Sequence, residues 1–184
     1  MHLVVKFQGN AFETFAKRMD QLASGARFGI LAQALNEGGS MLRKATVAAE
    51  TAQTGLKQDV LERAQVESPA SGSYLTYTIS ATGGNVRLKY FDAKESGSGV
   101  TAKPWNKQTF YQGAFIKSGW QTRRVVLGGH VYKRVGSSRL PIKQERSGLF
   151  IPTEMTKGQT AATFESKSKL VLDTVVSRLG ALMP

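Results

Sequence analysis

The chain has 184 residues, of which 41% are hydrophobic and 21% charged, the composition of a globular protein long enough to bury one core. It contains no cysteine, and its two histidines, His2 and His130, are far apart in sequence, which excludes disulfides and thiolate metal sites and argues against a zinc site. The net charge is +12, yet thirteen of the 25 basic residues and only three of the 13 acidic ones fall within residues 85–146. Charge concentrated in this way steers anionic partners toward one region, unless it is merely a solvated basic face.

The first third of the chain has mainly the period of helices. A weak alternation over residues 3–7 predicts a short strand, and Asn10 can cap a helix over residues 10–22. The apolar stripe of that helix is Phe12, Phe15, Met19 and Leu22. The opening residues are too short an apolar run for a secretory signal, and no stretch approaches the roughly 18 apolar residues of a membrane span, so we expect no membrane partner.

A longer helix is predicted to begin near Arg27. Its apolar stripe comprises Leu31, Ala34, Leu35, Met41, Leu42, Ala45 and Ala48. Gly38 and Gly39 interrupt this stripe, which indicates either a close contact with another helix or a kink. A third helix is predicted over residues 56–65, and Pro69 ends the helical region.

The hydrophobic period then changes to two residues, which indicates strands. Strands are predicted over 74–79 and 86–90, joined near Gly83 and Gly84, and a hairpin is predicted to pair 123–127 with 130–134. That hairpin would place Arg123 and Arg124 across from Arg134 and Lys133. Like charges that face each other destabilise a sheet unless an anion or an acidic partner screens them, so this hairpin is a candidate interaction surface.

Residues 92–107 are rich in Gly and Ser and are predicted to form a long, mobile loop that becomes ordered in an assembly. Trp105 is either an anchor at a subunit contact or a tryptophan folded onto the sheet. The loop lacks the lysine-serine ending and the following helix of a phosphate-binding loop. The chain closes with a predicted helix over 160–182 whose stripe belongs to the core or to an interface. This stripe comprises Phe164, Val171, Leu172, Val175, Leu179 and Leu182.

These elements predict one α+β domain over residues 1–184, with N-terminal helices and a long C-terminal helix packed on a mostly antiparallel sheet. Residues 1–67 are expected to be mainly helical and residues 73–143 to form a basic sheet region. No cysteine is available as a nucleophile, neither histidine lies in a nucleophile motif, and no acidic cluster suits a metal. We therefore expect a protein without catalytic residues, metal or cofactor.

Several short motifs occur in a characteristic order along the basic region. They are Val-Arg-Leu-Lys-Tyr-Phe at 86–91, Asp-Ala-Lys-Glu at 92–95, Gly-Val at 99–100, Gly-Ala-Phe-Ile at 113–116, Lys-Arg at 133–134 and Arg-Leu-Pro-Ile-Lys at 139–143. In this order they resemble the minor tail protein Z family of long-tailed bacteriophages. The resemblance covers about residues 85–143 and departs after Lys143, where Gln-Glu-Arg-Ser-Gly-Leu-Phe replaces the family's usual Gly-Pro-Ser segment.

The resemblance implies a tail completion protein, a structural virion component at the head-proximal end of the tail or in the neck, made in the host cytoplasm. It implies self-association into a ring, with a hexamer expected, and contacts with a tail terminator, a tail tube or a head-tail connector, around a channel that carries DNA. The residues expected to face DNA or an acidic partner are Arg123, Arg124, Lys133, Arg134, Arg139 and Lys143. The residues expected at subunit contacts are Val100, Lys103, Trp105 and Lys107. The alternative is a free-standing nucleic-acid-binding module, distinguished by salt-dependent DNA binding as a monomer.

Overall fold

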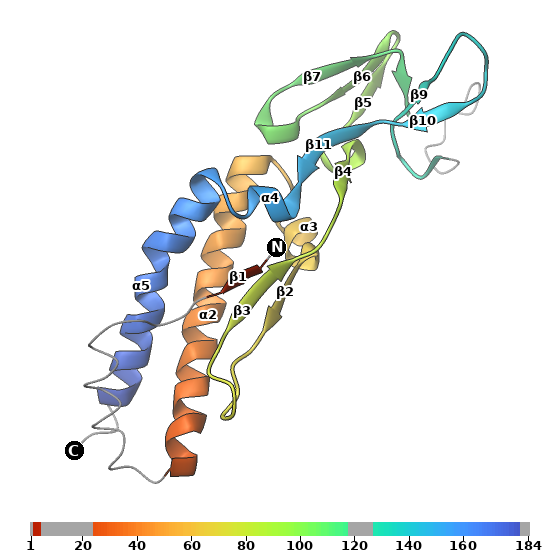
Figure 1. The fold of residues 1–184 in the computed structure, drawn as a ribbon. Helices are drawn as coiled ribbons and strands as arrows, with labels where there is room; N and C mark the ends of the chain where they lie inside the picture. The colour runs from red at the N-terminus through yellow and green to blue at the C-terminus, as the bar shows by residue number, and fades with distance from the viewer. Residues whose placement is uncertain (1, 5–23, 118–126, 181–184) are drawn as a thin grey trace.

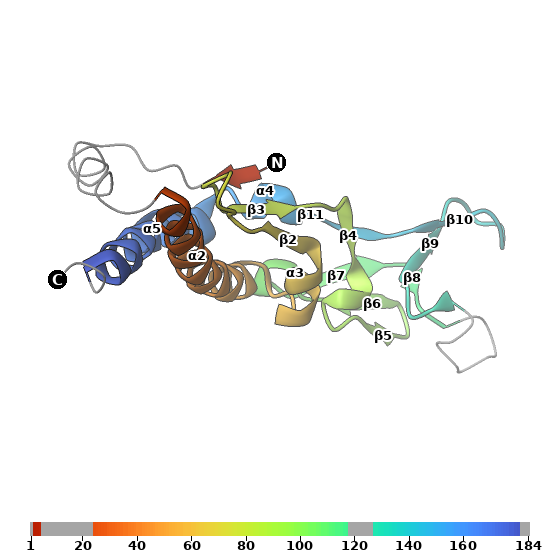
Figure 2. The ribbon, with the colours of Figure 1, turned by 90° about the horizontal axis from the view of Figure 1, so that it is seen from below.

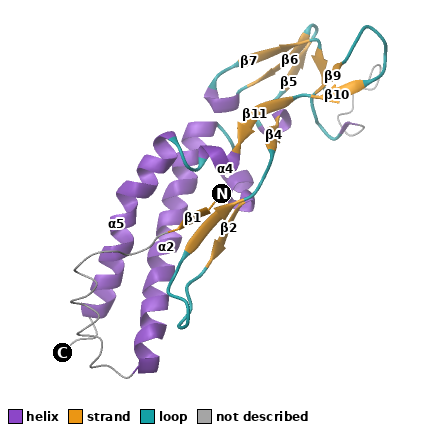
Figure 3. Cartoon of the chain, viewed as in Figure 1, coloured by secondary structure: helices purple, strands orange, loops and turns teal. Residues whose placement is uncertain are grey.

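The computed structural model describes residues 2–4, 24–117 and 127–180 of the chain. It confirms the α+β class, with antiparallel strand pairs throughout the described residues. Two long helices, α2 (Ser24–Thr54) and α5 (Gly158–Gly180), run side by side in opposite directions and form one end of an elongated molecule (Figure 1). Small sheets form the other end, as the colouring by secondary structure makes clear (Figure 3).

Helix α2 runs without a break through both of its central glycines. A Cβ atom at Gly38 would come 2.9 Å from the Cα atom of Val171 on α5, and one at Gly39 would overlap the ring of Tyr77. The two glycines therefore let α2 approach α5 on one side and the residues before β3 on the other. Of the two readings of this glycine pair, the close contact is right and the kink is wrong.

Burial on two sides explains why the predicted stripe of α2 is only partly right. Leu31, Ala34, Leu35 and Leu42 are buried, but Met41 and Ala48 are exposed. Their places are taken by Thr46, Val47, Ala49 and Glu50, which lie in the interior. A single stripe at a period of 3.6 residues describes a helix with one buried face, whereas α2 packs against both a helix and a sheet.

The sheet beside α2 has the strand order β1-β3-β2. Its strands are β1 (His2–Val4), β2 (Gln65–Ser68) and β3 (Thr78–Ala81), and β2 directly follows helix α3 (Gln58–Ala64). Tyr77, Ile79 and Ala81 alternate into the core, as the period of two predicted. The two strands predicted to be joined near Gly83 and Gly84 do follow each other, but they do not pair, because β3 has β1 and β2 as its neighbours.

After Gly84 the chain leaves this sheet and builds the distal end of the molecule. Its elements are β4 (Asn85–Arg87), the 3-10 turn η1 (Leu88–Tyr90), β5 (Lys94–Ser96), β6 (Gly99–Ala102), the turn η2 (Pro104–Asn106), β7 (Thr109–Gln112), β8 (Ala114–Phe115), β9 (Tyr132–Arg134), β10 (Ile142–Gln144) and β11 (Arg146–Phe150). They form a β4–β11 pair and two three-stranded sheets, ordered β5-β6-β7 and β10-β9-β8. The predicted sheet region over residues 73–143 is thus divided into several small sheets that extend to Phe150.

The segment 92–107 is the largest departure from the prediction. In place of a loop it contains the antiparallel strands β5 and β6, in which Val100 and Ala102 are fully buried. One core then continues from Val47 of α2 through Leu88 and Val100 to Leu149, so the distal sheets are packed onto the helical end. Deleting this segment would therefore remove part of that core.

The chain returns from β11 through the short helix α4 (Ile151–Glu154) to α5. Val171 and Val175 of α5 are buried, as predicted, and they pack against α2, whereas Leu172 is exposed. The predicted helix over 10–22 and the side chains of Leu179 and Leu182 lie outside the described residues.

Candidate functional site

The predicted partner-facing residues that can be placed lie on the sheet farthest from the helices (Figure 2). Strand β9 pairs with β8 on one edge and with β10 on the other, so Lys133 faces Ala114 and Lys143, and Arg134 faces Ile142. The prediction that Lys133 and Arg134 pair with the 123–127 segment is therefore wrong. Arg123 and Arg124 themselves lie outside the described residues.

Two cations do face each other across strands of this sheet, but they are not the predicted pair. Lys133 and Lys143 are directly opposite each other in the β9–β10 register, and both are exposed. Cross-strand neighbours share one face of a sheet, so their like charges repel. An anion placed between or above the two ammonium groups would relieve this repulsion.

Arg134 and Arg139 engage each other and the surrounding protein. A guanidinium nitrogen of Arg134 donates a hydrogen bond of 2.6 Å to the carbonyl oxygen of Arg139, and the group lies 5.6 Å from the centre of the Phe115 ring. These contacts hold the turn between β9 and β10. Arg134 thus has a structural role that the sequence did not indicate, and Lys133 and Lys143 are the freer of the predicted cations.

The structure brings together a second group of basic side chains that the sequence did not single out. Arg87 of β4 is directly opposite Arg146 of β11. The Nζ atom of Lys89 lies 3.4 Å from Nε2 of His130. Burial, and then the charges of Lys89, Arg87 and Arg146, lower the pKa of His130 below its usual value. His130 therefore lies within electrostatic range of these three cations.

The sequence pattern indicated the position of two members of this group, Arg87 and Lys89, but not that of the others. Arg87 and Lys89 alternate with apolar residues in the sequence, which placed them on a polar strand face. Their proximity to His130 and Arg146 depends on the pairing of β4 with β11. This pairing joins distant segments: the hydroxyl of Ser147 donates a hydrogen bond to the carbonyl of Val86, 61 residues earlier in the chain. No short-range pattern encodes that pairing.

The predicted subunit-contact residues divide into buried and exposed positions. Val100 has no exposed surface, so it cannot anchor a neighbouring subunit, and that prediction is corrected. Lys103 and Lys107 are exposed. Trp105 remains 41% exposed, but its turn η2 docks against α2, where Asn106 donates a 2.7 Å hydrogen bond to the carbonyl of Ala52.

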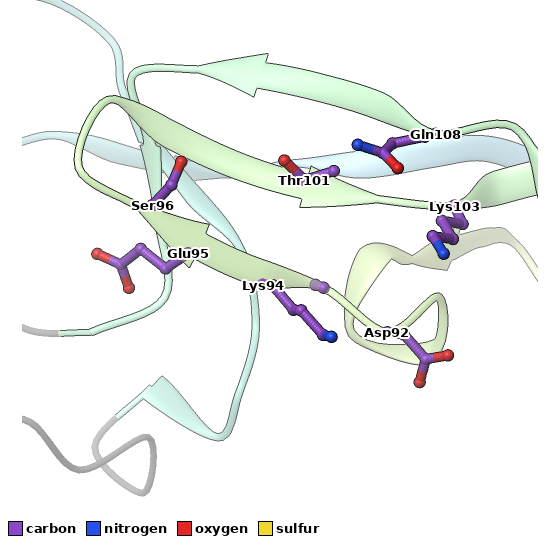
Figure 4. A pocket seen from close by; sticks show the side chains of 8 residues that line it. Asp92, Lys94, Glu95, Ser96, Thr101, Lys103 and Gln108 are labelled. Atoms are coloured by element: carbon purple, nitrogen blue, oxygen red, sulfur yellow. The ribbon is translucent and has the colours of Figure 1, made fainter.

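A hollow with a volume of about 610 Å³ lies along β5 and β6 (Figure 4). Its charged side chains do not converge, because Glu95 and Asp92 lie at opposite ends of the row. Glu95 accepts hydrogen bonds from the backbone amides of Ile116 and Lys117, at 3.0 and 2.8 Å, and Asp92 lies 3.9 Å from the ammonium of Lys57. Both carboxylates have structural partners, and the lining offers no pairing of a nucleophile with a base.

A buried polar pair lies between α2 and β2. Gln65 donates a 2.6 Å hydrogen bond to one oxygen of Glu50, while the other oxygen of Glu50 and the amide oxygen of Gln65 are buried without partners. Burial raises the pKa of Glu50 to about 7, and the nearby charge of Glu154 acts in the same direction. A protonated carboxyl supplies the donor that the ionised form lacks, which is a reason for Glu50 to hold its proton in the folded chain.

Within the described ranges, no three His, Asp or Glu side chains are grouped as metal ligands. None of the helices in those ranges is long and apolar enough to cross a bilayer. Comparisons of the chain with models of protein families, with curated proteins and with solved structures gave no match.

Proposed function

We propose that this protein is a structural component of a bacteriophage tail, of the tail completion type, that acts at the head-proximal end of the tail and takes part in joining it to the head. The proposal assigns it to the virion, in the tail or neck. Its support from sequence is the ordered set of motifs over residues 85–143, from Val86 to Lys143. Its role is assembly rather than catalysis.

The observation that carries the proposal is the opposed pair of Lys133 and Lys143 on the sheet farthest from α2 and α5. An exposed pair of like charges weakens a sheet in the isolated protein and becomes favourable against an anionic partner. An elongated subunit with amphipathic helices at one end and this basic sheet at the other suits a ring in which the sheet meets DNA or an acidic tail or neck protein.

The test uses a phage whose genome encodes this chain. A stop codon early in the gene should give heads and tails that remain separate in electron micrographs, and the wild-type gene on a plasmid should restore joined particles. The double variant K133E/K143E should fail to restore them, because it reverses the charge of the distal sheet. The matched variant K167E/K169E makes the same change on the exposed side of α5 and should restore joining.

Two results would overturn the proposal. Normal infectious particles from the stop-codon phage would exclude a role in joining, and full restoration by K133E/K143E would remove the distal sheet from the function. Images of the purified protein, alone and added to tails, test the ring directly. A monomer that binds DNA but never associates with tails would instead favour a free-standing nucleic-acid-binding module.

A further inference from the structure

A hollow lined by three arginines lies between α3 and the β4–β11 pair, where the distal sheets leave the helical end. The arginines come from three different elements: Arg63 from α3, Arg87 from β4 and Arg146 from β11. The hollow has a volume of about 440 Å³, and none of its lining residues is an Asp or a Glu. We refer to it as the arginine groove.

The fold brings these three arginines to one hollow although their like charges repel each other. Arg87 and Arg146 are opposite each other in the strand register. Arg146 donates a 2.9 Å hydrogen bond to the carbonyl of Asn85, which uses one of its five N–H groups. Arg63 pairs with Asp59 at 2.8 Å, but both side chains are about two-thirds exposed, and exposed pairs of this kind are readily exchanged for another anion.

The rim of the arginine groove is open at its glycines, and further positive charge acts near two of its arginines. A Cβ atom at Gly83 or Gly84 would meet nothing within 4 Å, so a bulky ligand can approach the backbone there. Lys89 lies 3.4 Å from His130, whose pKa is lowered by burial and then by the charges of Lys89, Arg87 and Arg146. An anion in the groove would face cations on several sides.

We propose that the arginine groove binds the phosphate groups of a nucleic-acid backbone. A guanidinium presents a planar fork of donors that matches a phosphate with two parallel hydrogen bonds. A second cationic place lies close along the chain, because β10 runs through Glu145 into β11, and Lys143 of β10 is directly opposite Lys133. A polyanion with regularly repeated charges can occupy both places, which favours nucleic acid over a single acidic side chain.

The proposed binding of nucleic acid by the arginine groove does not depend on the proposed function. Only its biological setting, DNA that passes through an assembled tail, rests on that function. The probe is a fluorescently labelled DNA duplex of about 20 base pairs, titrated with the full-length protein at several salt concentrations. The test variant is R63Q/R87Q/R146Q. The control variant, K44Q/K167Q/K169Q, removes the same three charges from exposed positions on α2 and α5.

We expect the groove variant to lose about tenfold or more in affinity and its salt slope to fall by about one for each phosphate contact removed. The control variant should stay within about twofold of the wild type, since its lysines are not in the groove. Equal losses in both variants would show that only net charge matters and would overturn the proposal. Unchanged affinity of the groove variant would overturn it as well.

A measurement on the wild-type protein keeps the test independent of whether the triple variant folds. Bound phosphates should raise the pKa of His130, because they offset the charges of Lys89, Arg87 and Arg146. The chain has only one other histidine, His2, so the imidazole signal can be assigned and titrated by NMR with and without the duplex. No shift in the pKa at saturating DNA would overturn the proposal.

A further arm of the experiment separates nucleic acid from an acidic protein. Poly-glutamate of matched charge should compete weakly for the labelled duplex; if it binds more tightly than DNA and depends on the same three arginines, the partner is acidic protein and the proposal fails. Because these assays use the isolated protein, their failure leaves the head-tail joining test untouched. Failed complementation in the phage likewise leaves the binding result intact.

Discussion

Gly38 of α2 lies against Val171 of α5 so closely that a Cβ atom on the glycine would come 2.9 Å from the Cα atom of the valine. The contact is to backbone, so a rotamer change at Val171 cannot relieve it fully. Replacing Gly38 by Ala should therefore separate the two helices. This close approach is the packing reason for a residue that otherwise weakens the middle of a helix.

The first prediction compares two glycines of the same helix. Gly38→Ala should destabilise the protein by about 1–3 kcal/mol, because overpacking outweighs the gain in helix propensity. Gly29→Ala is the matched control: a Cβ there meets nothing within 4 Å, so it should stabilise the protein by up to about 1 kcal/mol. Urea unfolding followed by circular dichroism measures both. If both variants were more stable than the wild type, α2 and α5 would not approach each other closely at Gly38.

The second prediction concerns two adjacent valines of α5. Val175 is 7% exposed and packs against α2, whereas Val176 is 57% exposed. Val175→Asp should cost about 3–5 kcal/mol, because it buries an unpaired charge, and should prevent soluble folding or assembly. Val176→Asp should change the free energy of unfolding by no more than about 0.5 kcal/mol. Yield of soluble protein and chemical unfolding distinguish them, and a stable Val175→Asp protein would place that side of the helix outside the core.

The third prediction is a pH dependence caused by Glu50. Its pKa in the folded chain is about 7, above the model-peptide value of 4.5, so the folded state retains a proton that the unfolded chain releases. The stability gained from that proton is fully present below pH 4.5 and is lost as the pH rises through about 7. Glu50→Gln cannot ionise, so at pH 8 it should be more stable than the wild type by up to about 3 kcal/mol.

The free energy of unfolding of both proteins, measured between pH 5 and pH 8, gives this difference, because this range spans the pKa of Glu50 in the folded chain. Glu165→Gln, at an exposed position of α5, is the control and should follow the wild type at every pH. Parallel stability curves for the wild type and Glu50→Gln would mean that Glu50 has an ordinary pKa and that its oxygens are hydrated.

The fourth prediction concerns the opposed lysines of β9 and β10. The variant K133Q/K143Q should be as stable as the wild type or slightly more stable at low salt, because it removes a repulsion across the strands. The wild type should gain stability as salt rises to about 0.1 M, where charges are screened beyond about 10 Å, and the variant should gain less. Melting temperatures in a salt series measure this effect.

The control for these lysines is K167Q/K169Q, whose side chains are exposed on α5. It should keep the salt response of the wild type. An equal salt response in all three proteins would show that the two lysines extend apart into water. Marked destabilisation of K133Q/K143Q would instead indicate a structural contact of the lysine side chains.

The sequence by itself determined the class of the fold and the identity of its main helices. The period of 3.6 residues predicted the helices that became α2 and α5, because each keeps apolar residues such as Leu35 and Val171 toward the other. The alternation of Tyr77 and Ile79 predicted buried strand residues in the same way. These signals are local, since side-chain direction repeats within a few residues along one element.

Only the tertiary structure decided which strands pair and therefore which charges meet. Gly83 and Gly84 have the composition of a hairpin turn, yet β3 and β4 join different sheets, and Arg87 meets Arg146 from a distant segment. Gly-Ser content made residues 92–107 resemble a mobile loop, although neighbouring strands bury Val100. Strand pairing is a nonlocal choice, set by which edges and apolar faces find each other in the folded chain, and local patterns carry no record of that choice.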